Sequence, residues 1–265
     1  MHALLIDGLN LIRRVHAGVP RSEDVEDGER HRQAVEESCV GSLRRALRYH
    51  QPSHAVCAMD HEDLTWRGLL FPDYKKNRQP MPCDLRSTLG SIISRFDTRG
   101  VGTVSVPGFE ADDVIASIAR KVVEAGARVT VLSTDKSFFQ LISESVSVHD
   151  HFSARDFDDE YVFQRFGVGP GRLVDLFALS GDSSLHISGA RGIGLRTAVK
   201  LLEEYGDLES ILSTVGDIPG SRGKKVRESV DSVRLARRLV ALRSDVTIGA
   251  TLKQFRFDSS GLGVT

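Results

Sequence analysis

The chain has 265 residues, 40% of them hydrophobic, which is enough for one large core with or without a small satellite domain. Its formal net charge of −1 excludes a generic basic nucleic-acid binder, and no apolar stretch approaches the roughly 20 residues of a membrane-spanning helix. The charge is unevenly distributed, because residues 1–185 carry 22 basic and 27 acidic residues, whereas residues 186–265 carry 13 and 9. An acidic body that holds cations and a basic end that holds phosphates would produce this asymmetry.

The N-terminal apolar run is interrupted by Asp7 and Asn10 and lacks a basic leader, so it predicts a buried strand and not a signal peptide. The three cysteines, Cys39, Cys57 and Cys83, are widely spaced and indicate neither a disulfide framework nor a CxxC metal site. We therefore expect a protein of the reducing cytoplasm.

Short apolar runs alternate with longer helical patterns, which is typical of an α/β fold with a mainly parallel sheet flanked by helices. The predicted strands are 2–7, 54–60, 101–106, 127–134 and 145–149. The predicted helices are 30–50, 84–99, 111–125, 158–166, 171–180, 194–205 and 222–242. After about residue 180 the alternation stops. We therefore expect an α/β core at 1–180, a helical subdomain at 181–257 and a tail at 258–265.

Two long connections interrupt this pattern at 18–29 and 61–82. Both are charged and contain glycine or proline, and long loops in a compact domain are usually functional or disordered. The second connection contains Trp66, which either stacks on an unpaired base or serves as a partly buried anchor.

Acidic residues stand at the ends of four predicted strands or open the helix that follows. They are Asp7, Asp60, Glu110, Asp112, Asp113 and Asp135. Because the carboxyl ends of parallel strands meet at one edge of a sheet, we expect these six acids to converge. Such a group repels itself unless cations occupy it, and oxygen-only ligation favours Mg²⁺ or Mn²⁺ over zinc. Taken singly, each acid is equally well explained as a turn residue or a helix cap.

The series LLIDGLNLI, LFPDYKKNR, PGFEADDVIAS, VLSTDKSFFQL, ALSGDSS and GARGIGLRTAVKLL resembles the 5′-nuclease family, which includes the N-terminal domain of bacterial DNA polymerase I and the stand-alone flap endonucleases. These motifs span about residues 3–205 in the family's order, and the chain is most similar to the small stand-alone members. The resemblance implies a PIN-like core with a C-terminal helix-three-turn-helix subdomain. It also implies a structure-specific 5′ nuclease that hydrolyses phosphodiester bonds in branched or gapped DNA.

The resemblance further implies a two-metal centre. Its ligands would be Asp7, Asp60, Glu110, Asp112 and Asp113 at the first cation and Asp135 and Asp182 at the second. Two departures from the family's pattern weaken the second site, since Ser137 and Leu185 stand where relatives often have aspartate. His186 either substitutes as a ligand or is an ordinary surface residue.

Basic residues between the acid motifs match the family's DNA-binding residues. Lys75 and Arg78 would meet the scissile phosphate and stabilise its charge, unless they belong to a merely solvated loop. The glycine-rich hairpin at 189–194 and the helix after it would bind DNA backbone through N–H groups. The implied DNA contacts there are Arg191, Gly192, Ile193, Gly194, Leu195, Arg196 and Thr197. In the family the hairpin holds K⁺ on main-chain carbonyls, which by position belong to Leu179, Ser180, Ser188, Ala190 and Ile193.

The predicted substrate is DNA with a 5′ flap, a gap or a free 5′ end. We expect a monomer that acts near the nucleoid and needs Mg²⁺ or Mn²⁺ and K⁺, but no membrane and no organic cofactor. The alternative is a branched-DNA binding protein whose weakened second metal site leaves little turnover.

Overall fold

The computed structural model describes residues 1–20 and 28–258. Within them lies one sheet of six strands in the order β3-β2-β1-β4-β5-β6. The strands are β1 His2–Asp7, β2 His54–Ala58, β3 Gly102–Val104, β4 Arg128–Leu132, β5 Val146–Asp150 and β6 Arg155–Phe157. All are parallel except β6, which pairs antiparallel with β5. The predicted fold class, an α/β fold with a mainly parallel sheet, is confirmed, and β1 lies between β2 and β4.

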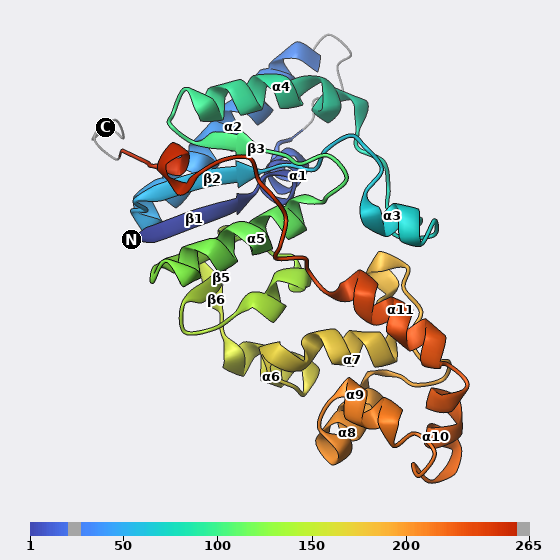
Figure 1. The fold of residues 1–265 in the computed structure, drawn as a ribbon. Helices are drawn as coiled ribbons and strands as arrows, with labels where there is room; N and C mark the ends of the chain where they lie inside the picture. The colour runs from blue at the N-terminus through green and yellow to red at the C-terminus, as the bar shows by residue number, and fades with distance from the viewer. Residues whose placement is uncertain (21–27, 259–265) are drawn as a thin grey trace.

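Helices cover both faces of this sheet, as Figure 1 shows. On one face lie α1 Gly8–Gly18, α2 Gly28–His50 and α4 Cys83–Asp97, and on the other lies α5 Ala111–Glu124. The middle of strand β1, residues 3–6, is therefore apolar on both faces, because Leu4 and Ile6 pack toward the first set while Ala3 and Leu5 pack toward α5. Gly8 lets α1 begin directly after β1, since a Cβ there would lie 2.3 Å from the sulfur of Met59.

The second half of the chain is mostly helical. Its helices are α6 Asp159–Phe166, α7 Leu173–Ser180, α8 Leu195–Tyr205, α9 Leu208–Ser213, α10 Gly220–Arg227 and α11 Val230–Val240. Short 3-10 helices connect the elements, namely η2 Lys136–Leu141, η3 Pro170–Arg172, η4 Ser183–Leu185 and η5 Leu252–Phe255. Helix α7 packs on α8 and α11, and one apolar cluster continues from the sheet through α5 into these helices. A boundary at residue 180 stays a prediction, although the packing of α7 favours an earlier one.

Residues 241–257 leave the helical part and return to the sheet, where Figure 1 shows the red segment running from α11 toward β2. The backbone N–H of Val246 donates to Ser117 Oγ at 3.0 Å, and that of Phe257 donates to the carbonyl oxygen of Ser53 at 2.9 Å. The side chain of Phe257 packs in the cluster beneath α2 and α4. This segment, assigned above to the helical subdomain, thus lies on the α/β core.

Some predicted boundaries differ from the structure. The pattern at 222–242 forms two helices, α10 and α11, which are separated near Ser229. Four elements were not predicted from the sequence, namely α1, α3 Trp66–Leu70, α9 and the short edge strand β6. Residues 21–27 of the first predicted connection and 259–265 of the predicted tail lie outside the described residues. Among the described helices, none has the length and apolar character needed to cross a bilayer.

Candidate metal and phosphate site

Strands β1, β2 and β4 deliver three aspartates to one rim of the sheet. Asp7 accepts the backbone N–H of Asn10 at 3.1 Å and the hydroxyl of Ser133 at 2.8 Å. Asp60 accepts the N–H of Ala111 at 2.8 Å, and so it ties the end of β2 to the start of α5. Asp135 caps η2 by accepting the N–H of Ser137 at 2.9 Å. These acids therefore act as caps and also share one rim.

The charges at this rim repel one another. Burial, together with the nearby charges of Asp135 and Asp60, raises the pKa of Asp7 to about 6. Burial also raises the pKa of Asp112 well above its usual range, and Asp135 and Asp7 raise it further, while Lys75 opposes the rise. Such a group of mutually repelling carboxylates is the donor set of a hard divalent cation.

The rim acids are not closely gathered. Among the described residues, no three of these acids place one carboxylate oxygen each within 4.8 Å of one another; the one trio of residues that meets this distance lies elsewhere. The rim therefore fits a cation that reaches some ligands through water, and Mg²⁺ commonly keeps several of its waters in proteins.

Glu110 connects the rim to the basic segment after α3. It is buried at the start of α5 and accepts hydrogen bonds from Tyr74 Oη at 3.0 Å, Arg67 Nη1 at 2.8 Å and Lys75 Nζ. Burial alone would lower the pKa of Lys75, but the carboxylates of Glu110 and Asp112 raise it, so this lysine is charged. The position of Lys75 depends on its φ of 55° and on its backbone N–H, which donates to the Leu185 carbonyl oxygen at 2.9 Å.

Two further arginines lie at the same edge. Arg78 is exposed, and its charge acts on both Lys75 and Arg13. Arg13 is half-buried on α1. Burial lowers the pKa of Arg13, the charge of Arg78 lowers it further, and the charge of Asp60 raises it. Sequence reasoning missed Arg13. The signal was present, because Arg13 lies three residues after Asn10, on the same side of a helix that starts at the rim.

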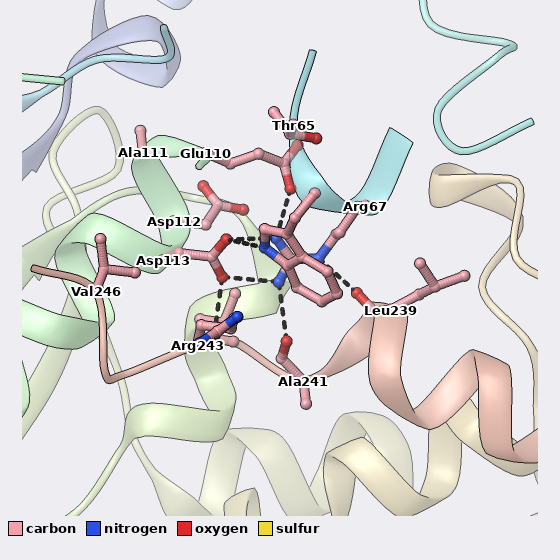
Figure 2. A network of polar contacts seen from close by, with 12 residues as sticks. Thr65, Arg67, Glu110, Ala111, Asp112, Asp113, Leu239, Ala241, Arg243 and Val246 are labelled. Atoms are coloured by element: carbon pink, nitrogen blue, oxygen red, sulfur yellow. Dashed lines mark hydrogen bonds and ion pairs between the residues drawn. The ribbon is translucent and has the colours of Figure 1, made fainter. Parts of the chain in front are cut away.

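Asp113 lies in a different environment from Asp112, and Figure 2 shows its carboxylate turned toward Arg67 and Arg243. Arg67 binds it with two nitrogens at 2.7 and 2.8 Å, and Trp66 Nε1 and the backbone N–H of Arg243 each donate at 2.9 Å. Four donors saturate the acceptor positions of a carboxylate. These contacts favour a structural ion pair for Asp113 over the expected role as a metal ligand.

The Arg67 side chain is 1% exposed and also reaches the carbonyl oxygens of Leu239 and Ala241 at 2.7 and 2.9 Å. It thus joins α3, the start of α5 and the end of α11. The ring of Trp66 lies 4.4 Å from the Arg67 guanidinium carbon. These contacts favour Trp66 as an anchor and not as a base-stacking residue.

The expected second metal site contains a lysine. Lys136 Nζ donates to Asp182 Oδ1 at 2.8 Å, and the same oxygen accepts Ser184 Oγ at 2.6 Å. Ser137 Oγ lies 3.3 Å from Asp112 Oδ2, so it faces the first group of acids. His186 is exposed, which fits an ordinary surface residue. The Lys136 to Asp182 pair was missed because its members lie 46 positions apart.

Backbone hydrogen bonds in the hairpin after α7 link three of the residues that are expected to hold K⁺, namely Leu179, Ala190 and Ile193. The N–H of Ala190 donates to the Leu179 carbonyl oxygen at 2.8 Å, and that of Ile193 to the Ala190 carbonyl oxygen at 2.9 Å. Gly189 is required there, since a Cβ would lie 2.3 Å from the Leu179 oxygen. Ser180 and Ser188 line an open groove that reaches Leu195 at the start of α8. Of the predicted DNA contacts here, Arg191, Gly194 and Arg196 are exposed, whereas Ile193 is buried.

Comparison with known proteins locates two family models on the chain. One, described as the 5′-3′ exonuclease N-terminal resolvase-like domain, matches residues 2–167, and another, described as the 5′-3′ exonuclease C-terminal SAM fold, matches residues 168–261.

Similar curated proteins include one named flap endonuclease Xni from Colwellia psychrerythraea strain 34H. It is 38% identical over 270 residues, which cover 98% of this chain and 93% of the relative. A protein of the same name from Aeromonas hydrophila subsp. hydrophila is 37% identical and covers 97% and 96% of the two chains.

Solved structures with the same fold include the 5′-exonuclease of phage T5 with bound zinc, at a TM-score of 0.77 and 20% identity, which covers 91% of this chain and 90% of that one. The T5 D15 protein crystallised with metal ions gives a TM-score of 0.76 at 21% identity, with the same coverage.

Proposed function

The chain belongs to the 5′-3′ exonuclease family, and from this membership we propose that it is a metal-dependent flap endonuclease that hydrolyses phosphodiester bonds in DNA. The observation that supports this most strongly is the rim that Asp7, Asp60 and Asp135 share. Lys75 is held next to this rim by its contact with Glu110. The proposed substrates carry a 5′ flap, a gap or a free 5′ end. We propose that the protein acts as a monomer in the cytoplasm, close to the nucleoid.

The proposed ligands of the catalytic cation are Asp7, Asp60, Glu110, Asp112 and Asp135, reached directly or through water. Bound Mg²⁺ or Mn²⁺ would lower the pKa of a coordinated water and neutralise charge on the phosphate. The protein holds these acids in place with its own donors. Ser133 fixes Asp7, the N–H of Ala111 fixes Asp60, and Arg67 fixes Glu110.

Phosphate binding is assigned to the basic residues at the same edge. Lys75 Nζ would exchange part of its contact with Glu110 for the scissile phosphate and stabilise the negative charge that develops there. The exposed Arg78 and the half-buried Arg13 would bind neighbouring phosphates. Duplex DNA would contact the N-terminal end of α8 and the hairpin before it, with K⁺ on the hairpin carbonyls.

The alternative function, a branched-DNA binding protein with little turnover, rests on the second site. Lys136 already supplies a positive charge to Asp182, and neither Ser137 nor Leu185 provides a carboxylate. We propose that a second cation binds weakly at this place, or only together with a DNA phosphate.

The test is cleavage of a 5′-flap oligonucleotide in Mg²⁺. We expect the unmodified protein to cut near the flap junction and Asp112→Asn to lose about 100-fold or more of the rate, because the rim loses a charge that faces the cation. Binding of the same DNA in EDTA should persist. Asp63→Asn, which changes an acid whose side chain is 62% exposed in the loop after β2, is the matched control. Binding without cutting by the unmodified protein would favour the alternative.

A further inference from the structure

Away from the rim, side chains from three helices meet on the face of the sheet that α1, α2 and α4 cover. His16 lies in the last turn of α1, His31 in the first turn of α2 and Asp84 in the first turn of α4. His16 Nε2 lies 3.0 Å from Asp84 Oδ2, and His31 Nε2 lies 3.8 Å from the same oxygen. In the part of the chain that the structure describes, no other trio of His, Cys, Asp or Glu brings its ligand atoms within 4.8 Å of one another.

His31 is oriented as a metal-binding histidine would be. Its Nδ1 lies 3.3 Å from the carbonyl oxygen of Pro20, to which an Nδ1–H would donate. Ligating histidines commonly donate their other ring N–H to a carbonyl in this way, which leaves a lone pair on Nε2. That Nε2 atom is buried and has no hydrogen-bond partner, and the side chain is 10% exposed. A buried lone pair that faces a carboxylate is unfavourable unless a proton or a metal ion lies between them.

We propose that His16, His31 and Asp84 form a metal site separate from the acidic rim, which binds Zn²⁺ or a chemically similar divalent transition metal. Two imidazoles and one carboxylate suit zinc far better than Mg²⁺, which prefers oxygen ligands. Tetrahedral zinc ligands at about 2.0–2.2 Å from the ion lie roughly 3.3 Å apart. The separations of 3.0 and 3.8 Å bracket this value, so small side-chain shifts complete the site.

The position of the trio gives the ion a structural task. Helix α4 begins where the segment that carries Lys75 and Arg78 ends, and α1 carries Arg13. An ion bound to Asp84, His16 and His31 would fasten the start of α4 to both α1 and α2. It would therefore hold one end of the basic segment without touching the rim acids.

The competing explanation is a purely ionic cluster, in which protonated histidines pair with Asp84. The experiment is a titration of the full chain with Zn²⁺ in a large excess of Mg²⁺, so that Mg²⁺ occupies the rim. We expect one zinc per chain, with the imidazole ¹⁵N resonances of His16 and His31 shifting at one equivalent. His31→Asn and Asp84→Asn should each weaken zinc binding at least about 10-fold. Loss of a residue that only hydrogen-bonds to a metal ligand already lowers metal affinity by about this factor.

His61→Asn is the matched control, because His61 also lies beside an aspartate, Asp63 at 3.3 Å, yet belongs to no such trio among the described residues. It should keep the zinc. The proposal is overturned if the unmodified chain binds no zinc in excess Mg²⁺, if His31→Asn binds it as tightly, or if the two ¹⁵N signals do not move. The ¹⁵N measurement needs no variant, so it decides the matter even if a substitution unfolds the chain. Zinc binding requires no DNA cleavage, so this result stands apart from the nuclease assignment.

Discussion

Asp112 and Asp113 are adjacent residues with different partners. Asp112 faces the rim and its neighbouring carboxylates, whereas Asp113 is saturated by Arg67, Trp66 and the backbone of Arg243. Successive residues of a helix point about 100° apart, so one side chain reaches the rim and the next reaches the packed interior. The motif EADD alone does not reveal this division, because it depends on an arginine 46 positions earlier.

Arg67→Met should destabilise the fold strongly. The change leaves two buried acids, Asp113 and Glu110, without their main partner, and breaking such a pair typically costs about 3–5 kcal/mol. Urea unfolding followed by circular dichroism measures the loss. Asp245→Ala, which breaks the exposed pair with Arg243, should unfold at nearly the same urea concentration as the unmodified protein. Equal stability of the two variants would contradict the structural role of Arg67.

Lys75→Ala should lower the cleavage rate of a 5′-flap substrate by about 100-fold or more, because a preorganised positive charge is lost beside the reacting phosphate. Single-turnover kinetics with saturating protein measures the chemical step. Lys76→Ala is the matched control, since the side chain of Lys76 is 67% exposed and pairs only with Asp73 in the described contacts. A similar loss in both variants would mean that the segment provides only general electrostatic attraction.

At the level of the elements, strand order places the acids, and this much could be predicted from the sequence. An apolar run that ends in an acid recurs at Asp7, Asp60 and Asp135, and a parallel sheet brings such ends together. Helix α1 was missed because its apolar residues continue those of β1 without a turn between them. Helix α3 has only five residues and lies within a segment that looked like a loop. Short elements of this kind are held by tertiary contacts, here by Arg67, and not by their own periodicity.

The turns η2 and η4 carry Ser137 and Leu185, the two departures from the family's pattern at the expected second metal site. Both departures can be reversed by substitution. The double variant Ser137→Asp with Leu185→Asp adds two carboxylates to the pocket that Asp182 also lines. If this site limits catalysis, the variant should cut faster and reach half its maximal rate at lower Mg²⁺ than the unmodified chain. A Mg²⁺ titration of the initial rate measures both effects. An unchanged titration curve would show that the second site does not limit turnover.

On the scale of the whole molecule, a histidine cluster couples stability to pH. His50 lies between His2 and His149, with ring centroids at 6.4 and 4.6 Å. Burial, together with the charges of His149 and His2, lowers the pKa of His50 to about 4 from an ordinary value of 6.5. The unfolded chain therefore takes up a proton before the folded one does as the pH falls. The contribution of neutral His50 is present above pH 6.5 and is lost between pH 6.5 and about 4.

His50→Gln should flatten this pH dependence. Urea unfolding in EDTA at several pH values between 6.5 and 4 compares the variant with the unmodified chain, and EDTA removes any bound divalent metal. We expect the unmodified protein to lose more of its unfolding free energy over this range than the variant does. Parallel curves would exclude His50 as a source of acid sensitivity.

The return of residues 241–257 to the sheet has a consequence for biosynthesis. The N–H of Arg243 binds Asp113, that of Val246 binds Ser117 on α5, and that of Phe257 binds the carbonyl oxygen preceding β2. During translation these partners leave the ribosome more than a hundred residues apart. The helix that presents Asp112 thus stays incompletely anchored until nearly all the described chain has emerged. A nascent chain would therefore acquire its finished acidic rim only late in synthesis, when the helical half is already available to contact DNA.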